Sequence, residues 1–161
     1  MKTPVNVARR RVFLKGAAAG SVAAAIAGSG WLRSPSALAA DWPKTAFTAA
    51  STTDALTALY GTSDASASEA IRVKAPAQAE NGALVPVEVS TTLPNVDSIA
   101  ITVDRNPRPF VCRMSFSGAE PFIGVRIKMR QTSAVRCVVR SEGKLYVKTQ
   151  LVKVTVGGYD S

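Results

Sequence analysis

From residue 71 to residue 156, apolar side chains recur at every second position in a series of short runs. A period of two is typical of β-strands that bury one face. Six such runs precede residue 140, and a longer one follows that could form one strand or two. Their inward positions are Ile71, Val73 and Ala75; Val85, Val87 and Val89; Ile99, Ile101 and Val103; Phe110, Cys112, Met114 and Phe116; Ile123, Val125, Ile127 and Met129; Val135, Cys137 and Val139; and those from Leu145 to Val156.

Turn-forming residues separate these runs. Residues 80–82, 106–109 and 141–143 are rich in Asn, Gly, Pro and Ser, residue types that favour turns because they tolerate or impose unusual φ values. Short alternating strands at this spacing predict an all-β fold, an immunoglobulin-like β-sandwich of about seven strands. The alternation predicts these core residues: Phe110, Met114, Phe116, Val125 and Ile127.

Residues 40–68 form an N-terminal segment with one predicted short helix, Thr53 to Tyr60. Leu56, Leu59 and Tyr60 share one face of that helix. Thr52 or Thr53 can cap its start, and Gly61 can end it. Residues 62–68 are small and polar, which is typical of a linker.

Residues 1–39 resemble a twin-arginine export signal. The motif residues are Arg10, Arg11, Phe13, Leu14 and Lys15, and a weakly apolar stretch rich in Ala and Gly follows them. Ala37 and Ala39 supply the small residues that a signal peptidase reads. We therefore expect cleavage after Ala39, a periplasmic location and no stable membrane insertion of the cleaved protein. The alternative is an N-terminus that remains uncleaved at the membrane.

Charge and composition narrow the function classes. Six basic residues and no acidic ones precede residue 40, so the net charge falls from +9 to +3 without the leader. The remaining basic residues are spaced along strands, and we expect no nucleic-acid partner. Histidine is absent, which removes Ser–His–Asp and Cys–His catalysis and the imidazole ligands of zinc and blue-copper sites. We expect no enzymatic activity, no metal and no cofactor.

The two cysteines, Cys112 and Cys137, lie on the inward phase of their strands. Outside the cytoplasm they could form a core disulfide. They could equally be two buried free thiols that pack as small hydrophobic side chains. The sequence leaves both alternatives open.

An ordered series of segments resembles the SoxY family of sulfur-oxidation carrier proteins. It begins with Ile71-Arg72-Val73-Lys74-Ala75-Pro76 and continues through residues 79–83, 85–89, 106–107, 119–121, 126–129 and 132–133. It ends with residues 143–146 and with Val152-Lys153-Val154-Thr155-Val156-Gly157-Gly158. The resemblance defines residues 69–158 as an immunoglobulin-like SoxY-type domain.

The resemblance implies a partner and a carrier role. SoxY proteins pair with a second β-sandwich, SoxZ, and carry sulfur intermediates on a cysteine in a C-terminal Gly-Gly-Cys-Gly-Gly arm. Here Gly157 and Gly158 match the arm, but Tyr159 stands at the cysteine position, so residues 159–161 form an altered tail. The resemblance thus implies a periplasmic protein of thiosulfate oxidation that binds a SoxZ-like subunit but lacks the carrier thiol. Two alternatives stay open: a functional carrier whose tail is altered by a gene-model error, and an unrelated exported immunoglobulin-like binding module.

Overall fold

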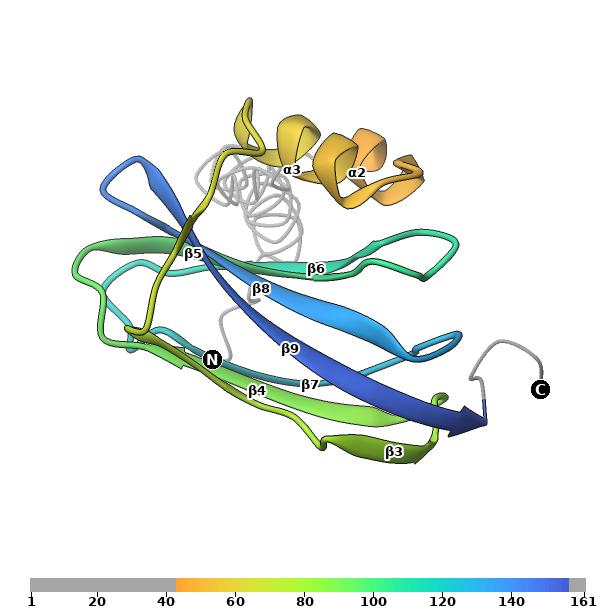
Figure 1. Ribbon diagram of the computed structural model, residues 1–161. Coiled ribbons are helices and arrows are strands. Elements are labelled where there is room, and N and C mark those ends of the chain that lie inside the picture. Colours follow the sequence, from red (N-terminus) through yellow and green to blue (C-terminus); the bar gives the residue numbers. More distant parts are fainter. Residues whose placement is uncertain (1–42, 157–161) are drawn as a thin grey trace, which may run out of the picture. The chain divides into compact units, whose positions relative to one another are not determined.

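The computed structural model describes residues 43–156, which form two short helices followed by nine strands (Figure 1). The export motif, the cleavage positions Ala37 and Ala39, and the tail from Gly157 onward lie outside the described residues, so these expectations stay predictions. The elements are α2 (Lys44–Thr48), α3 (Thr52–Tyr60), β1 (Ser66–Ala67), β2 (Ile71–Lys74), β3 (Gln78–Asn81), β4 (Val85–Thr91), β5 (Val96–Val103), β6 (Phe110–Ser115), β7 (Phe122–Ile127), β8 (Ser133–Ser141) and β9 (Lys144–Val156).

The strands form two sheets that pack face to face. The larger sheet has the order β1-β9-β8-β5-β6, with β3 added beside β9, and the smaller has the order β2-β4-β7. Most neighbours are antiparallel, but β1 and β3 run parallel to β9. The predicted all-β sandwich is therefore confirmed, with nine strands in the described residues instead of about seven. The additional strands show no apolar alternation, because β1 has two residues and Ala79 is the one apolar residue of β3.

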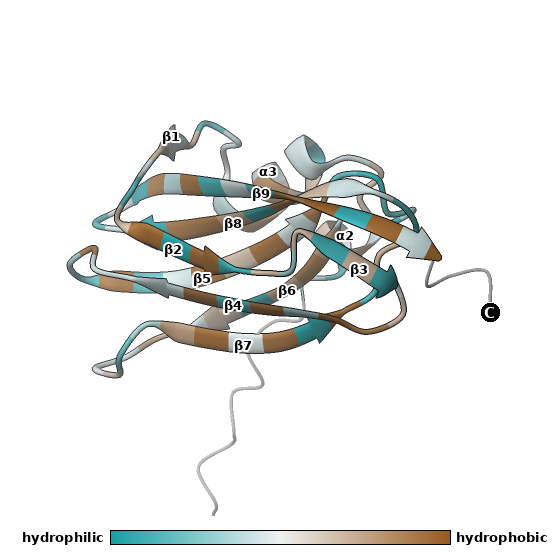
Figure 2. Ribbon diagram, turned by 60° about the horizontal axis from the view of Figure 1, so that its bottom comes forward, coloured by the Kyte–Doolittle hydropathy of each residue, from teal (hydrophilic) through white to brown (hydrophobic). Residues whose placement is uncertain are grey.

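The main core lies between the two sheets. Buried Val and Ile side chains from β4, β5, β7, β8 and β9, such as Val87 and Ile101, fill it together with Met129 of the β7–β8 loop. Figure 2 shows hydrophobic and hydrophilic bands alternating along β4 and β9, as strands with one buried face require. The inward phase of the predicted strands is thus correct for most of the sandwich.

The two helices cover the outer face of the larger sheet (Figure 1). Helix α3 begins after Ser51, whose side-chain oxygen accepts a hydrogen bond from the Asp54 amide at 3.0 Å, and ends at Gly61, which has φ of 78°. The helix and its glycine stop are confirmed, but the cap is Ser51 instead of Thr52 or Thr53. Helix α2 was not predicted, because five residues carry too short a pattern; it is held by the Phe47 ring, which lies 4.4 Å from that of Phe110.

A β-bulge changes the inward phase of β6. Ile101 of β5 pairs with Cys112, but its neighbour Thr102 pairs with Phe110, so one residue of β6 is left over. Phe110 consequently turns toward the helices, whereas Cys112 packs against the main core. An extra residue in one strand reverses the alternation beyond it, and the sequence does not reveal where such a residue falls.

The five residues predicted to lie in the core therefore differ in how deeply the structure buries them. Phe110 and Ile127 are buried, although Phe110 belongs to the cluster beneath the helices. Phe116 and Val125 are partly buried against the main core. Met114 is 44% exposed, so its assignment to the core was wrong. It lies on β6, the edge strand of the larger sheet, where burial is incomplete.

Candidate functional site

The first candidate site is the end of the sandwich where β9 finishes, because the predicted carrier arm follows directly. Strand β9 pairs with β8 as far as Val152 and then with β3. The amide of Gly82 donates to the Val156 carbonyl at 2.7 Å, and the amide of Val154 donates to the Thr132 hydroxyl at 2.9 Å. Hydrogen bonds on both sides hold β9 in place up to its last described residue. We call this end of the sandwich, where β9 stops, the arm end.

Three loops meet at the arm end. The Met129 amide donates to the Gly82 carbonyl at 2.7 Å, which joins the β7–β8 loop to the β3–β4 turn. Buried Asn106 bridges the β5–β6 loop to the same segment, since its side chain donates to the Lys128 carbonyl at 2.7 Å and accepts from the Arg130 amide at 2.9 Å. Figure 1 shows these loops at the same end of the molecule as the arrowhead of β9. The base of the arm is therefore a hydrogen-bonded platform.

The second candidate is the pair of cysteines. Both residues pair with Ile101, Cys112 from β6 on one side and Cys137 from β8 on the other. Two strand spacings of about 4.8 Å place their Cα atoms roughly 10 Å apart, beyond the limit of about 7 Å for a disulfide. Both are free cysteines in the structure. The disulfide alternative is thus wrong here, and the buried-thiol alternative holds.

Burial also suppresses the reactivity of these thiols. Desolvation raises the pKa of Cys112 to about 11. Desolvation and the neighbouring Cys112 raise the pKa of Cys137 to about 12. Because the thiolate is the nucleophile, fewer than about one Cys112 in a thousand is reactive at neutral pH. Neither side chain is suited to carry a sulfur group.

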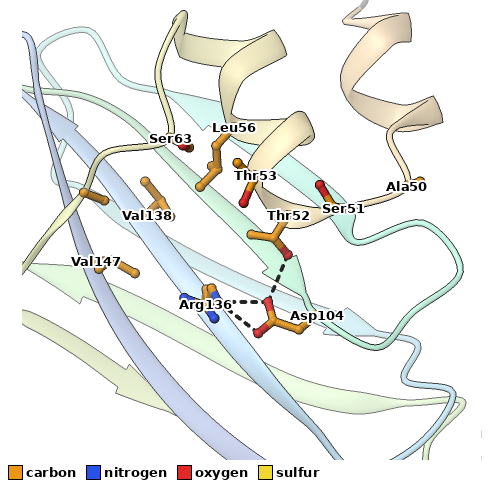
Figure 3. Close-up of a pocket in the computed structure, with 11 residues that line it drawn as sticks. Ala50, Ser51, Thr52, Thr53, Leu56, Ser63, Asp104, Arg136, Val138 and Val147 are labelled. Atoms are coloured by element: carbon orange, nitrogen blue, oxygen red, sulfur yellow. Dashed lines mark hydrogen bonds and ion pairs between the residues drawn. The ribbon is translucent and has the colours of Figure 1, made fainter.

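The third candidate is a pocket of about 350 Å³ between α3 and the outer face of the larger sheet (Figure 3). Thr52, Asp104 and Arg136 form its polar side, and Leu56 and Val138 are among its apolar lining residues. Figure 3 shows the three polar side chains joined to one another. Sequence analysis did not single out these residues, because 52, 104 and 136 are far apart in the chain and no motif links them.

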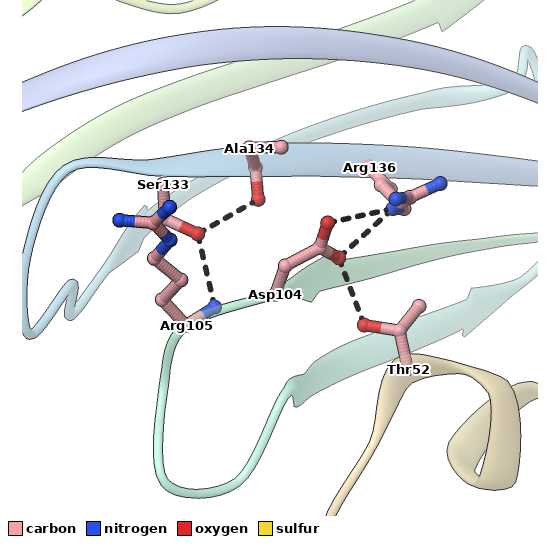
Figure 4. Close-up of polar contacts among 6 residues, drawn as sticks. All are labelled: Thr52, Asp104, Arg105, Ser133, Ala134 and Arg136. Carbon is pink, nitrogen blue, oxygen red and sulfur yellow. Dashed lines mark hydrogen bonds and ion pairs between the residues drawn. The ribbon is translucent and has the colours of Figure 1, made fainter.

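The polar contacts of this pocket attach the helix to the sheet. The Nε of Arg136 donates to both carboxylate oxygens of Asp104, at 2.8 and 3.0 Å, and the Thr52 hydroxyl donates to the same carboxylate at 2.9 Å (Figure 4). The hydrogen bond to Asp104 is the main cause of a raised pKa of Arg136. The Asp104 carboxylate and the Arg136 guanidinium thus neutralise each other, and we assign the cluster a structural role.

The described residues show neither a metal cluster nor a membrane span. Within residues 43–156, no group of three or more Asp, Glu or Cys side chains is arranged to hold a metal ion. In the same part of the chain, no helix has the length and apolar character needed to cross a membrane.

Comparison with known proteins identifies the family. The family model described as "Sulfur oxidation protein SoxY" matches residues 56–158, more than half of the chain. This chain belongs to the SoxY family. The resemblance inferred from the sequence is confirmed, and the matched range begins inside α3, so it includes part of the helical segment as well as the sandwich.

A solved structure supports the same assignment. The sulfur carrier protein SoxY from Chlorobium limicola f thiosulfatophilum is 38% identical, with a TM-score of 0.61, over 70% of this chain and 99% of that chain. A chain from a structure on T cell activation by the bacterial superantigen toxic shock syndrome toxin-1 is 9% identical with a TM-score of 0.36, over 52% of this chain and 98% of that one, too low to bear on fold or function. No curated protein matches the sequence. The chain thus has the fold of a SoxY sulfur carrier.

Proposed function

We propose that this SoxY-family protein is a periplasmic, non-enzymatic subunit of sulfur oxidation that binds a SoxZ-like β-sandwich and carries no covalent sulfur. The family membership supports a role in sulfur oxidation, and the twin-arginine-type motif supports export. The absence of cargo is supported by the state of the thiols, and the retention of a partner by the intact sandwich.

The observation that carries the proposal is the state of the available thiols. Tyr159 follows the Gly157-Gly158 pair where SoxY proteins have the carrier cysteine. A phenol oxygen, with a pKa of about 10, cannot form the sulfur–sulfur bond that holds the cargo. Cys112 and Cys137 cannot replace it, because burial keeps both protonated. Residues 43–156 therefore keep the carrier fold with no accessible thiolate among them.

Retention of a partner is supported by the sandwich itself. The likeness to the Chlorobium SoxY covers 99% of that chain, so the β domain is present in full. A protein–protein interface of ordinary size uses about 20–30 residues on each side. Substitution of one residue in the tail leaves such a surface intact.

Tetrathionate tests the absence of cargo. A thiolate attacks a central sulfur of tetrathionate, forms a new sulfur–sulfur bond and releases thiosulfate with the electron pair of the broken bond. We expect no adduct on the native protein at neutral pH, as read by intact mass. Tyr159→Cys, with two glycines added after it, should gain a single adduct, because this change supplies an exposed thiol.

The protein unfolded in guanidinium at alkaline pH is the matched control. It should gain two adducts, one on each cysteine, which shows that the reagent works and that burial causes the protection. A native protein that is modified as fast as the Tyr159→Cys variant would overturn the proposed absence of cargo.

Co-purification tests the partner. We expect a stable complex when the protein is co-expressed with a SoxZ-like protein encoded near it, and the same complex for the Tyr159→Cys variant. Absence of any complex with such proteins would overturn the partner half of the proposal and favour an unrelated binding module.

A further inference from the structure

The arm end carries exposed cations that form no ion pair with any other residue in the range 43–156. Arg105 lies on the β5–β6 loop, and Lys128 and Arg130 lie on the β7–β8 loop. All three side chains are exposed. The ion pairs within residues 43–156 involve other cations, namely Lys74, Arg136, Arg140 and Lys148. We call Arg105, Lys128 and Arg130 the basic rim.

The fold holds the basic rim in place. Met129 is fully buried, so the residues on either side of it, Lys128 and Arg130, extend toward solvent. The side chain of Asn106 binds the backbone of both residues, and the amide of Arg105 donates to the Ser133 hydroxyl at 3.0 Å (Figure 4). The three cations are therefore attached to anchored backbone, which lowers the entropy that binding has to overcome.

Two exposed aliphatic side chains lie beside the basic rim. Leu84 is 62% exposed and Val156 is 59% exposed. The Gly82–Val156 hydrogen bond brings both into one small area, and the Met129–Gly82 hydrogen bond connects this area to the rim. An apolar centre with a charged surround is the usual composition of a protein-binding surface.

Four exposed acidic residues lie at the opposite end of the sandwich. They are Glu69, Asp97, Glu120 and Glu142, of which Glu69 pairs with Lys148 and Asp97 with Arg140. At the arm end, Asp104 is neutralised by Arg136 and Thr52, which leaves Glu80 as the exposed acid near the rim. The arm end therefore keeps a net positive charge, which attracts an acidic partner.

We propose that the arm end is a docking surface for a protein that presents acidic side chains around an apolar recess. Leu84 and Val156 would enter the recess, and Arg105, Lys128 and Arg130 would face the acidic surround. Charge complementarity of this kind speeds and orients association. The proposal goes beyond the proposed function, because it requires neither a sulfur cargo nor a SoxZ-like partner.

The composition of the surface favours a protein over nucleic acid. Single-stranded nucleic acid stacks its bases on aromatic side chains, whereas the centre of this surface is aliphatic. The three cations stand on two separate loops, an arrangement that suits several separated carboxylates better than one small anion.

A peptide titration tests the docking surface. The probe is a synthetic peptide with two leucines between two runs of four glutamates, added to the intact ¹⁵N-labelled chain at low salt. We expect amide shifts at residues 82–84, 105–106, 128–130 and 156. We expect none at Glu120 and Glu142, which lie at the opposite end.

Charge reversal provides the matched comparison. Lys128→Glu with Arg130→Glu should weaken peptide binding by about tenfold, since two exposed attractive charge pairs become repulsive. Arg72→Glu with Lys144→Glu changes the net charge equally at two exposed cations outside the rim, and should leave the affinity within about twofold. Raising the salt concentration should weaken binding of the unaltered chain and have less effect on the first variant.

Several results would overturn the proposal. The first is an equal loss of peptide affinity in the two double variants, and the second is a set of amide shifts located away from the arm end. The third is binding of a peptide with lysines in place of the glutamates as tightly as the acidic peptide. Tighter binding of single-stranded DNA than of the acidic peptide would assign the rim to nucleic acid instead. None of these results alters the tetrathionate outcome, so failure here is distinguishable from failure of the proposed function.

Discussion

Replacing Phe110 by alanine tests the altered phase of β6. Phe110 is 4% exposed, and its ring lies 4.4 Å from that of Phe47 with the planes inclined at 59°. Truncation of a buried Phe costs about 3–5 kcal/mol. Met114→Ala should cost less than about 1 kcal/mol, because this side chain is 44% exposed. A strand without the bulge would place both residues in the same core and predict similar losses.

Urea unfolding measures the difference. With an m-value of about 2 kcal/mol/M, a loss of about 4 kcal/mol lowers the unfolding midpoint by roughly 2 M. The contact between the rings is isolated by a double-mutant cycle with Phe47→Ala and Phe110→Ala, for which we expect a coupling of about 0.5–1.5 kcal/mol. Equal losses for Met114→Ala and Phe110→Ala, or a coupling near zero, would refute the assignment of Phe110 to the helix-facing cluster.

Three further predictions concern the thiols, the helix contact and export. The pKa of each buried thiol is raised from the ordinary 9.0 to about 11 or 12, so the unfolded chain ionises first. The thiols should therefore contribute fully to the free energy of unfolding below pH 9, and this contribution should disappear as the pH rises toward 12. In urea unfolding at alkaline pH, Cys137→Ala should lose less stability with rising pH than the unaltered protein. Asp104→Asn weakens a partly exposed ion pair with Arg136 and should cost about 1 kcal/mol or less, with faster amide exchange in α3 than in β8. Replacing the arginines at positions 10 and 11 by lysine should leave the precursor in the cytoplasm, whereas the exported native protein should begin at Ala40 by mass; unchanged export of the variant would contradict the twin-arginine interpretation.

The elements that the sequence predicts correctly are those that depend on neighbours along the chain. Helix α3 follows from the spacing of Leu56, Leu59 and Tyr60 and from the glycine stop at Gly61, whose φ is 78°. The strands β4, β5 and β8 follow from their period of two. In each case the pattern lies within one element, so local rules are sufficient.

The features that escaped prediction depend on pairing between distant segments. The bulge that turns Phe110 toward the helices arises where β6 meets β5. The separation of Cys112 and Cys137 follows from their common partner Ile101, which lies in a strand between them. Alternation shows that both cysteines face inward, but it contains no information on strand order. The sequence therefore left the disulfide and the buried free thiols open as alternatives.

The sequence by itself determined the β-sandwich, the short helix and the family, because these are properties of residue type and local period. Only the tertiary structure decided which side chains meet. It separated the thiols and raised their pKa by burial, joined Thr52, Asp104 and Arg136, and gathered the basic rim around the end of β9. These outcomes depend on strand order and register, which arise from hydrogen bonds between segments far apart in the chain.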